Sequence, residues 1–517
     1  DYSEVTYPQD VINCRKCHDG SNPATPDGDN WRLVPNFSAC GGCHNMNEHP
    51  GGPPANNSVC TACHNDSDMS IDESHATANS TPNNPLLLED QRNIMYELID
   101  AFEDKGDLVI EFRITADGTP LDMANLPGDL ALPGRYPGFL LAWAEEQDGI
   151  EEPADFTNTG MRGAQPISIG IDDFSPISQN GVVGNITYDA GTGVNTATIT
   201  TEHFPFGATM RTVGLQGYFR QDVDEDGSYE YSLHTPSKVV TVDGDTERRV
   251  VVDNAKCGAC HEWFEGHGGN RVYEMAICTM CHTVNTSSSG RTISPDDISG
   301  GLLGDFDDYP EHLPGDFNPD DPLTYPEDAQ NFKDMIHGIH AAGFRERAYT
   351  HVRGGRQGYY DWSHITFPAE NGTRNCMLCH IEGTNELPLP EGVLATTVRT
   401  TNREDGQDTN TGEPPVQVER AFLDVPNFTD WVNTPVASSC FYCHTSVDAA
   451  AHMKLNGGLV SNPQSDAADV GEGWFLDIVS RWQLIGNDPW PWTQPESCAV
   501  CHGPGKTADV AEAHSAD

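Results

Sequence analysis

Cysteines and histidines are the residues of this chain whose spacing predicts chemistry. All 16 cysteines lie in Cys-x-x-Cys-His motifs, so the chain has eight such motifs and no other cysteine. This spacing attaches c-type haem, because the two thiols add to one porphyrin and the adjacent histidine binds the iron from one face. The sequence therefore predicts eight covalent haems, with thiols and proximal histidines at Cys14, Cys17 and His18; Cys40, Cys43 and His44; Cys60, Cys63 and His64; Cys257, Cys260 and His261; Cys278, Cys281 and His282; Cys376, Cys379 and His380; Cys440, Cys443 and His444; Cys498, Cys501 and His502.

Two other uses of paired cysteines fit the pattern less well. A disulfide framework also has an even number of cysteines, but it has no need for a histidine after every second one. A structural zinc site would combine two Cys-x-x-Cys pairs into one set of four ligands, and it does not need the trailing histidine each time.

Each iron has a second face, and twelve histidines outside the motifs could bind there. His337 and His340 are three residues apart, so one helical turn would present both rings on one side to two neighbouring haems. The distal ligands that we expect are His49, His75, His267, His337, His340, His452 and His514. The eighth is left open among His203, His234, His312 and His351.

An internal repeat supports this assignment. Residues 1–8 resemble residues 361–368, and Val34–Phe37 recurs as Val425–Phe428, each time ahead of a haem motif. His49 and His75 of the first copy correspond to His452 and His514 of the second. His364 corresponds to Glu4, so we do not expect it to be a ligand. The N-terminal segment is therefore a shortened copy of a haem-packing module, without the part that contains His337 and His340.

Composition and charge limit the classes of protein that fit. The chain has 517 residues, which predicts about two to four domains, and 37% of them are hydrophobic. Eight porphyrins would supply the missing apolar surface. The formal net charge of -51 disfavours binding to nucleic acid or anionic membranes. It suits a solvated surface that attracts cations, cationic partners or positively charged minerals.

The expected location is outside the cell or at its surface. No stretch approaches the roughly 18–20 apolar residues of a membrane span. The chain begins at Asp1 without Met, so we expect a mature exported protein whose signal peptide has been removed. With every cysteine in a motif, we expect no lipid anchor at the N-terminus.

The motifs divide the chain into three predicted domains, a trihaem module at 1–85, a β-barrel-like domain at 86–252 and a pentahaem domain at 253–517. The cysteine-free middle alternates apolar and polar residues, which predicts an antiparallel barrel or sandwich. The haem-bearing parts should be mostly irregular with short helices. Strands are expected at 108–115, 185–188, 196–200, 211–220, 229–233 and 248–252, and a helix at 89–102.

A weaker motif predicts a calcium site. Asp222, Asp224 and Asp226 alternate before Gly227, as in loops whose carboxylates converge on a hard cation. The usual acidic residue at the twelfth position is absent, because Leu233 stands there. An acidic β-turn explains the same residues equally well.

The C-terminal half resembles the OmcA/MtrC-type surface cytochromes of metal-reducing bacteria. The resemblance covers about residues 100–517 and rests on Thr246–Asp253, the motif ending at His261, His267–Arg271, the motif ending at His282, and His337–His340. It implies split-barrel Greek-key domains alternating with pentahaem domains. It also implies exposure at the cell surface and electron transfer to metal oxides, electrodes or soluble shuttles. Such proteins typically carry ten haems, and this chain has eight motifs.

Two classes of function remain. Haems with two histidine ligands have no open coordination site, so eight of them predict an electron-transfer protein that is not an enzyme. It would work with other multihaem cytochromes or with copies of itself, including as a filament if a neighbouring copy supplies the eighth ligand. The alternative is a multihaem oxidoreductase with one open-site haem that acts on a small nitrogen or sulfur oxyanion.

Overall fold

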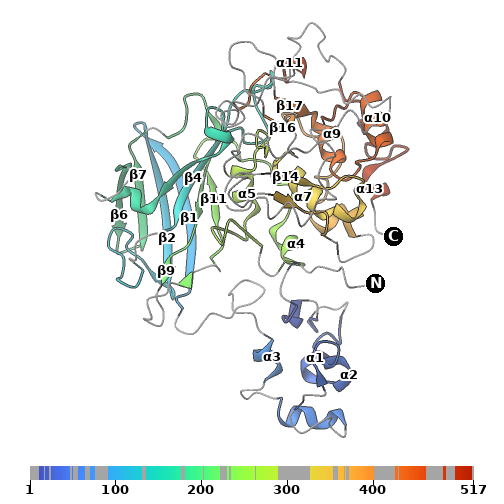
Figure 1. The fold of residues 1–517 in the computed structure, drawn as a ribbon. Helices are drawn as coiled ribbons and strands as arrows, with labels where there is room; N and C mark the ends of the chain where they lie inside the picture. Colours follow the sequence, from blue (N-terminus) through green and yellow to red (C-terminus); the bar gives the residue numbers. More distant parts are fainter. Residues whose placement is uncertain are drawn as a thin grey trace, which may run out of the picture.

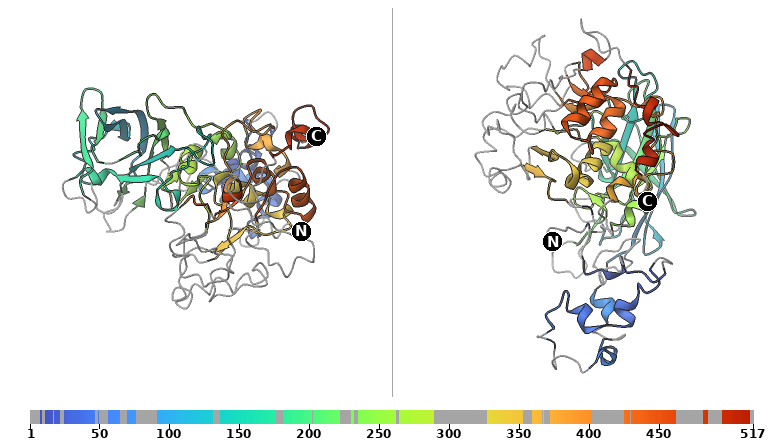
Figure 2. Two further views of the ribbon diagram at one scale, coloured as in Figure 1. Left: turned by 90° about the horizontal axis from the view of Figure 1, so that it is seen from above. Right: turned by 90° about the vertical axis from the view of Figure 1, so that its right-hand side faces the viewer.

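The computed structural model shows three parts in chain order (Figure 1). A small segment with short helices begins the chain, strands follow, and the C-terminal part combines short helices and small hairpins with irregular segments. The N-terminal segment lies below the other two parts in Figure 1 and in the right-hand view of Figure 2. The described residues are 8, 11–16, 18–21, 25–46, 49, 56–64, 70–75, 91–130, 136–175, 181–201, 203–221, 230–231, 235–261, 264–288, 327–352, 359–365, 367, 372–400, 425–428, 430–461, 481–484 and 495–514.

Two antiparallel sheets form the middle part. The first has the strand order β1-β2-β7-β6, with β3 also paired to β2, and the second has the order β11-β8-β4-β5. Their apolar faces share one core, in which Phe112 and Phe139 meet edge to face with ring centroids 5.2 Å apart. The strands are β1 (Ile94–Asp104), β2 (Asp107–Ala116), β3 (Thr119–Pro120), β4 (Gly138–Ala144), β5 (Ile167–Gly170), β6 (Gly184–Asp189), β7 (Val194–Ile199), β8 (Thr209–Gln216), β9 (Arg220–Gln221), β10 (Glu230–Tyr231) and β11 (Lys238–Thr241).

Most strands that the sequence predicts here are confirmed. The expected strand at 108–115 is β2, and those at 185–188 and 196–200 are the hairpin β6–β7. The strand expected at 211–220 is β8, which ends at Gln216, and only 230–231 of the strand expected at 229–233 is described as β10. The sequence analysis missed β4, because it is buried on both faces and its apolar run does not alternate.

The helix predicted at 89–102 is wrong, since residues 94–104 form the edge strand β1. Its register against β2 shifts between Leu98 and Asp100, where a β-bulge adds a residue. Ile94 and Tyr96 are buried before the bulge and Ala101 after it. The bulge therefore breaks the period of two, and the remaining spacing of apolar residues imitates a helix.

The strand predicted at 248–252 is also wrong, apart from one bridge between Val252 and His380. The Arg248 and Arg249 side chains form ion pairs with the buried Asp155, at 2.7 and 3.1 Å. These ion pairs with a loop of the middle part, together with the hydrogen bond from the Ile381 N–H to the Val251 carbonyl at 3.0 Å, hold this segment without a regular strand ladder.

Short helices, strands of two to four residues and irregular segments make up the rest of the described chain. The N-terminal segment has the 3-10 helices Cys14–Lys16 and Asn57–Ala62 and the helices α1 (Asn30–Leu33), α2 (Phe37–Cys40) and α3 (Ile71–Ser74). The C-terminal part has α4 (Asn254–Gly258), α5 (Met275–Cys281), α7 (Phe332–His340), α9 (Pro435–Phe441), α10 (Val447–Leu455), α11 (Arg481–Leu484), α12 (Ala499–His502) and α13 (Val510–Ala513), with hairpins β12 (Glu265–Gly266) and β13 (Arg271–Val272), β14 (Thr350–Val352) and β15 (Tyr359–Asp361), and β16 (Thr396–Arg399) and β17 (Trp431–Asn433).

The C-terminal part packs against the middle part. Ile277 and Met280 of α5 pack into an apolar cluster with Leu140 on β4. The buried Arg481 forms an ion pair with Asp148, which lies in a loop of the middle part. Within the described ranges, no helix is both long enough and apolar enough to cross a membrane.

Candidate haem-binding sites

All eight Cys-x-x-Cys-His motifs adopt the same local structure. In each, the backbone N–H of the histidine donates to the carbonyl of the first cysteine, at 2.8–3.0 Å. This i to i−4 bond closes one helical turn, so the first cysteine and the histidine lie on the same side of the backbone. Polar side chains begin several of these turns, and Asp253, for example, accepts from the N–H of Ala255 ahead of Cys257.

Seven of the eight motif histidines face a second histidine. The seven partners are the residues that the sequence analysis selected as distal ligands. Ring centroids lie 5.9–6.2 Å apart in the pairs His44–His75, His64–His49, His261–His340, His282–His267, His380–His337, His444–His514 and His502–His452.

This spacing is too wide for direct hydrogen bonds between the rings, but it fits one iron atom between them. A metal binds imidazole nitrogen at about 2.0 Å, which places two rings on opposite faces of one ion about 6 Å apart, centroid to centroid. The arrangement can therefore hold a haem with a histidine on each face. Within the described ranges, no group of three or more Cys, His, Asp or Glu side chains forms a site for a bare metal ion.

The backbone orients several of these rings. The Nδ1 atoms of His75, His340 and His514 each lie 2.8–2.9 Å from the carbonyl oxygen four residues earlier. His282 and His502 make the same contact with the carbonyls of Gln330 and Ala508, both at 2.9 Å. Because a carbonyl only accepts, Nδ1 must carry the proton, which leaves the Nε2 lone pair for iron.

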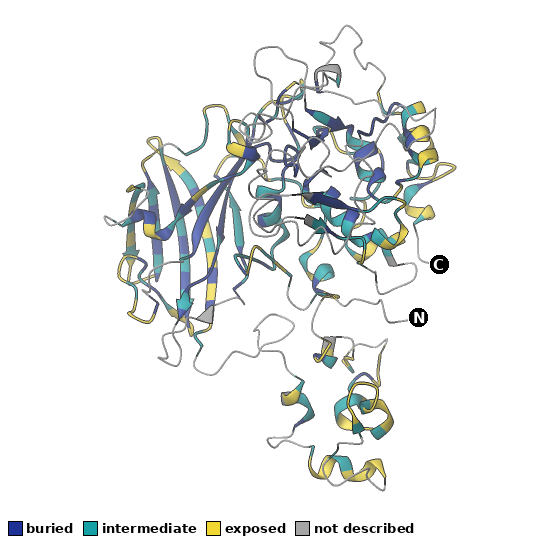
Figure 3. Ribbon diagram, viewed as in Figure 1, coloured by how far each residue is buried: buried dark blue, intermediate teal, exposed yellow. Residues whose placement is uncertain are grey.

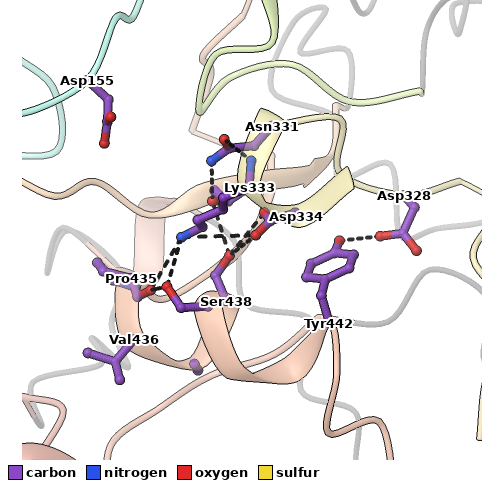
Figure 4. A network of polar contacts seen from close by, with 12 residues as sticks. Asp155, Asp328, Asn331, Lys333, Asp334, Pro435, Val436, Ser438 and Tyr442 are labelled. Atoms are coloured by element: carbon purple, nitrogen blue, oxygen red, sulfur yellow. Dashed lines mark hydrogen bonds and ion pairs between the residues drawn. The ribbon is translucent and has the colours of Figure 1, made fainter. Parts of the chain in front are cut away.

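Helix α7 supplies both His337 and His340, and a polar network attaches it to α9 (Figure 4). Lys333 donates to the carbonyl of Pro435 and to Ser439, at 3.4 and 3.3 Å. Ser438 donates to the fully buried Asp334, with 2.9 and 3.0 Å to its two carboxylate oxygens. The sequence analysis missed this network, because its partners lie about 100 residues apart.

Two backbone features fit the rings into the fold. Gly338 stands between the two α7 histidines, where a Cβ atom would lie 2.9 Å from the ring of Tyr349. His267 has a positive φ of 59° and is followed by Gly268 and Gly269, also with positive φ. This left-handed turn, which glycines tolerate, directs the His267 ring at His282.

Burial favours the uncharged forms of several of these side chains in the chain without haem. Burial, reinforced by the nearby His380, lowers the pKa of His337 to about 3, so its imidazole is neutral at physiological pH and can bind a metal. Burial also lowers the pKa of His380 and of His444. The pKa of the Cys278 thiol rises to about 12, again through burial, so this sulfur is not a free thiolate.

The eighth motif histidine, His18, differs from the other seven. Among the described residues, no second histidine ring faces the ring of His18. His203 lies in the middle part, with Nδ1 2.9 Å from the carbonyl of Thr201 and Nε2 3.6 Å from Glu103. His351 is buried and hydrogen-bonds with Gln330 at 2.9 Å. His234, His312 and the calcium candidates Asp222, Asp224 and Asp226 lie outside the described residues.

Comparison with known proteins identifies a domain in the second half of the chain. Residues 249–473 match the family model described as outer membrane cytochrome MtrC/MtrF-like, domains II/IV. No curated protein sequence matches the chain.

Two solved structures are similar to the chain. The outer membrane decahaem cytochrome OmcA shares 17% identity at a TM-score of 0.49, over 100% of this chain and 62% of that one. MtrC from Shewanella baltica OS185 shares 15% identity at a TM-score of 0.46, over 96% of this chain and 65% of that one. The chain thus spans less than two thirds of the length of either protein.

Proposed function

Because the chain belongs to the OmcA/MtrC-type family of outer-surface cytochromes through its domain at residues 249–473, we propose that it transfers electrons outside the cell through covalently bound haem c. The observation that carries the proposal is the set of seven facing histidine pairs, each with one member in a haem motif. A haem with a histidine on both faces has no open site for substrate, so its chemistry is electron transfer.

We propose eight haems, with Cys-x-x-Cys-His providing both thioethers and the proximal ligand of each. The distal ligands would be His49, His75, His267, His337, His340, His452 and His514, and the protein would position, orient and electrostatically tune each haem. This assignment divides the chain into a trihaem module at 1–85, a β-barrel-like domain at 86–252 and a pentahaem domain at 253–517. A calcium ion at Asp222, Asp224 and Asp226 stays a prediction.

Contacts between motifs support a continuous path for electrons. The N–H of Asp253, at the start of α4, donates to the carbonyl of Cys379 at 3.1 Å, and Lys256 of α4 donates to the carbonyl of Met377 at 2.9 Å. The Cys257 motif and the Cys376 motif therefore touch. His337 and His340 on α7 face these same two motifs, so one helix would join both haems from their other faces.

The acceptors that this proposal implies are metal oxides, electrodes or soluble shuttles, with other multihaem cytochromes as donors. The net charge of -51 suits attraction to positively charged mineral surfaces or to cationic partners. The protein would act at the cell surface or as an exported protein. As a finer proposal, copies of the chain assemble into a filament in which haems continue from one copy to the next.

Two measurements on the purified holoprotein test the function. The intact mass should exceed that of the chain by eight haems, and dithionite should reduce all of them. Addition of ferric oxide particles should then reoxidise all eight haems. A reduced protein that stays reduced beside the oxide, or that reoxidises at one haem only, would contradict a conduit to extracellular acceptors.

A further inference from the structure

The Glu496 side chain joins the last two haem motifs of the chain, at 440–444 and 498–502. It lies just ahead of the second of these motifs and reaches α9, the helix that carries the first cysteine of the other. Its Oε1 accepts from the N–H of Ala437 at 2.7 Å, and its Oε2 accepts from the N–H of Val436 at 2.8 Å. One carboxylate therefore ties one motif to the helix of the other.

Glu496 supplies the cap that α9 lacks from its own flanking residue. Thr434, just before α9, makes no side-chain hydrogen bond to the helix, because its hydroxyl accepts from the N–H of Leu459 at 2.9 Å and donates to Glu496 at 2.6 Å. The first N–H groups of a helix have no partner within the helix. Hydrogen bonds to an ionised acceptor are stronger than neutral ones. The start of α9 is thus held by a residue that lies 60 positions after Val436.

The backbone on both sides of Glu496 packs against the end of α10. The N–H of Ser497 donates to the carbonyl of Asn456 at 2.8 Å. Gly457 has a positive φ of 88°, and a Cβ atom there would lie 2.4 Å from the carbonyl oxygen of Pro495. Glycine therefore permits this close approach. These contacts keep the half-buried Glu496 side chain directed at α9.

The negative charge of Glu496 acts on sulfur atoms of both motifs. Burial, the neighbouring Cys498 thiol and the Glu496 carboxylate raise the pKa of the Cys440 thiol to about 11, although Lys333 opposes them. Burial and the Glu496 carboxylate also raise the pKa of the Cys498 thiol. Because these sulfurs would attach two haems, both porphyrins would lie within reach of the same carboxylate.

We propose that Glu496 is a positioning residue that fixes this haem pair and lowers the reduction potentials of both haems. On reduction each ferric iron accepts one electron, so each site loses one positive charge. A nearby negative charge therefore favours the ferric form. The proposal rests on the proposed function, because it requires a haem at each of the two motifs.

The corresponding joint of the N-terminal segment is neutral. There the side-chain oxygen of Asn57, just ahead of the motif at 60–64, accepts from the N–H of Phe37 at 3.0 Å. Phe37 stands three residues ahead of its motif, as Ala437 does. A neutral amide thus makes the same joint, so the hydrogen bonds alone do not require the charge of Glu496.

Reduction potentials of the purified holoprotein test this inference. Glu496→Gln loses the charge, while its one oxygen can still accept from Ala437 and Thr434. In a spectroelectrochemical titration, two of the eight haems should become easier to reduce by about tenfold in the equilibrium constant, or about 59 mV for one electron. Unchanged potentials in this variant would overturn the proposal.

Glu496→Asp separates the charge from the hydrogen bonds. It keeps the carboxylate on a shorter side chain, which should weaken the contacts with α9. We expect potentials close to those of the wild type and a lower midpoint of denaturant unfolding. A rise in potential as large as that of Glu496→Gln would show that lost packing, and not lost charge, moves the potentials, and would overturn the proposal.

Two further variants test whether the effect is local. Asp448→Asn removes one negative charge from an exposed position on α10, where water and salt should screen its effect, so its shift should be much smaller. Asn57→Asp adds a charge to the neutral joint and should lower the potentials of the haems at 40–44 and 60–64. Equal shifts from Asp448→Asn and Glu496→Gln would overturn the proposal, as would unchanged potentials in Asn57→Asp. Peptide masses that lack haem at 440–444 or 498–502 would instead contradict the proposed function.

Discussion

The N-terminal and C-terminal haem regions share local structure and differ in what surrounds it. In both, the final distal histidine follows a four-residue helix, and the pairs His44–His75 and His444–His514 have ring planes at 81° and 80°. In both, a side chain just ahead of the last motif accepts from a backbone N–H at the start of the preceding motif's helix. Asn57 accepts from Phe37 at 3.0 Å, and Glu496 accepts from Ala437 at 2.7 Å.

The difference lies in the apolar core. The C-terminal region buries Tyr349, Val398 and Tyr442 against α7, among other side chains. Among described residues 8–75, no hydrophobic side chain is fully buried, and Figure 3 shows mostly exposed and half-buried residues there. The same local motif thus forms in both regions, but the N-terminal copy depends on its haems for the apolar interior that the C-terminal copy partly supplies itself.

Haem removal should produce the largest contrast between the two regions. When the chain is made without haem attachment, we expect residues 1–75 to be unfolded, because no apolar core offsets the conformational entropy that is lost on folding. The sheets at 94–241 should stay folded, since their core consists of side chains. Hydrogen exchange read by mass spectrometry should find no protection in 1–75 and strong protection in β2 and β4, and equal protection would contradict the comparison.

Ion pairs should contribute unequally to the free energy of unfolding in the two regions. Arg481→Met leaves the buried Asp148 carboxylate without its partner, which should lower the free energy of unfolding by about 3–5 kcal/mol. Arg32→Met is the matched control, because Arg32 and Asp72 are about one-third exposed and such pairs contribute about 0–1 kcal/mol. Denaturant unfolding of both holoproteins measures the difference, and similar losses would contradict the burial argument.

The contact between α7 and Tyr349 is present only in the C-terminal region, and Gly338→Ala should weaken it. The new methyl group would clash with a ring whose hydroxyl donates to the carbonyl of Ala329 at 2.7 Å, so the ring cannot move freely. We expect a loss of about 1–3 kcal/mol and altered spectra of the two haems at α7. Gly343→Ala has open space around the added atom and should stay within about 0.5 kcal/mol of the wild type.

The smallest expected effect is a pH dependence of the α7 network. Burial raises the pKa of Asp334 to about 6 from its usual 3.8, because Lys333 and Ser438 compensate only partly. Between about pH 4 and 6 the folded protein holds a proton that the unfolded chain releases, so stability should fall as pH rises, by on the order of 1 kcal/mol per unit. Asp334→Asn should flatten this slope in denaturant titrations, and an unchanged slope would contradict the assignment.

Some elements were readable from the sequence because their signals are local. Alternation over Leu108–Thr115 predicted β2, and the turn between two short alternating runs predicted the β6–β7 hairpin. The same logic failed at 89–102, where a bulge broke the period, and at 248–252, where ion pairs with Asp155 replace a strand ladder. The buried strand β4 was missed, because its two covered faces depend on partners far away in the chain.

The sequence by itself was enough to predict covalent haem attachment. The two thiols and the histidine of each motif lie within one helical turn, so the motif needs no distant partner. The repeat also linked His49 and His75 to His452 and His514 as predicted second ligands. Only the tertiary structure decided which second histidine faces which motif, since His337 and His380 are brought together by the packing of α7 on Tyr349 and α9. It likewise left His18 without a described partner, because a ligand pairing depends on how remote segments pack.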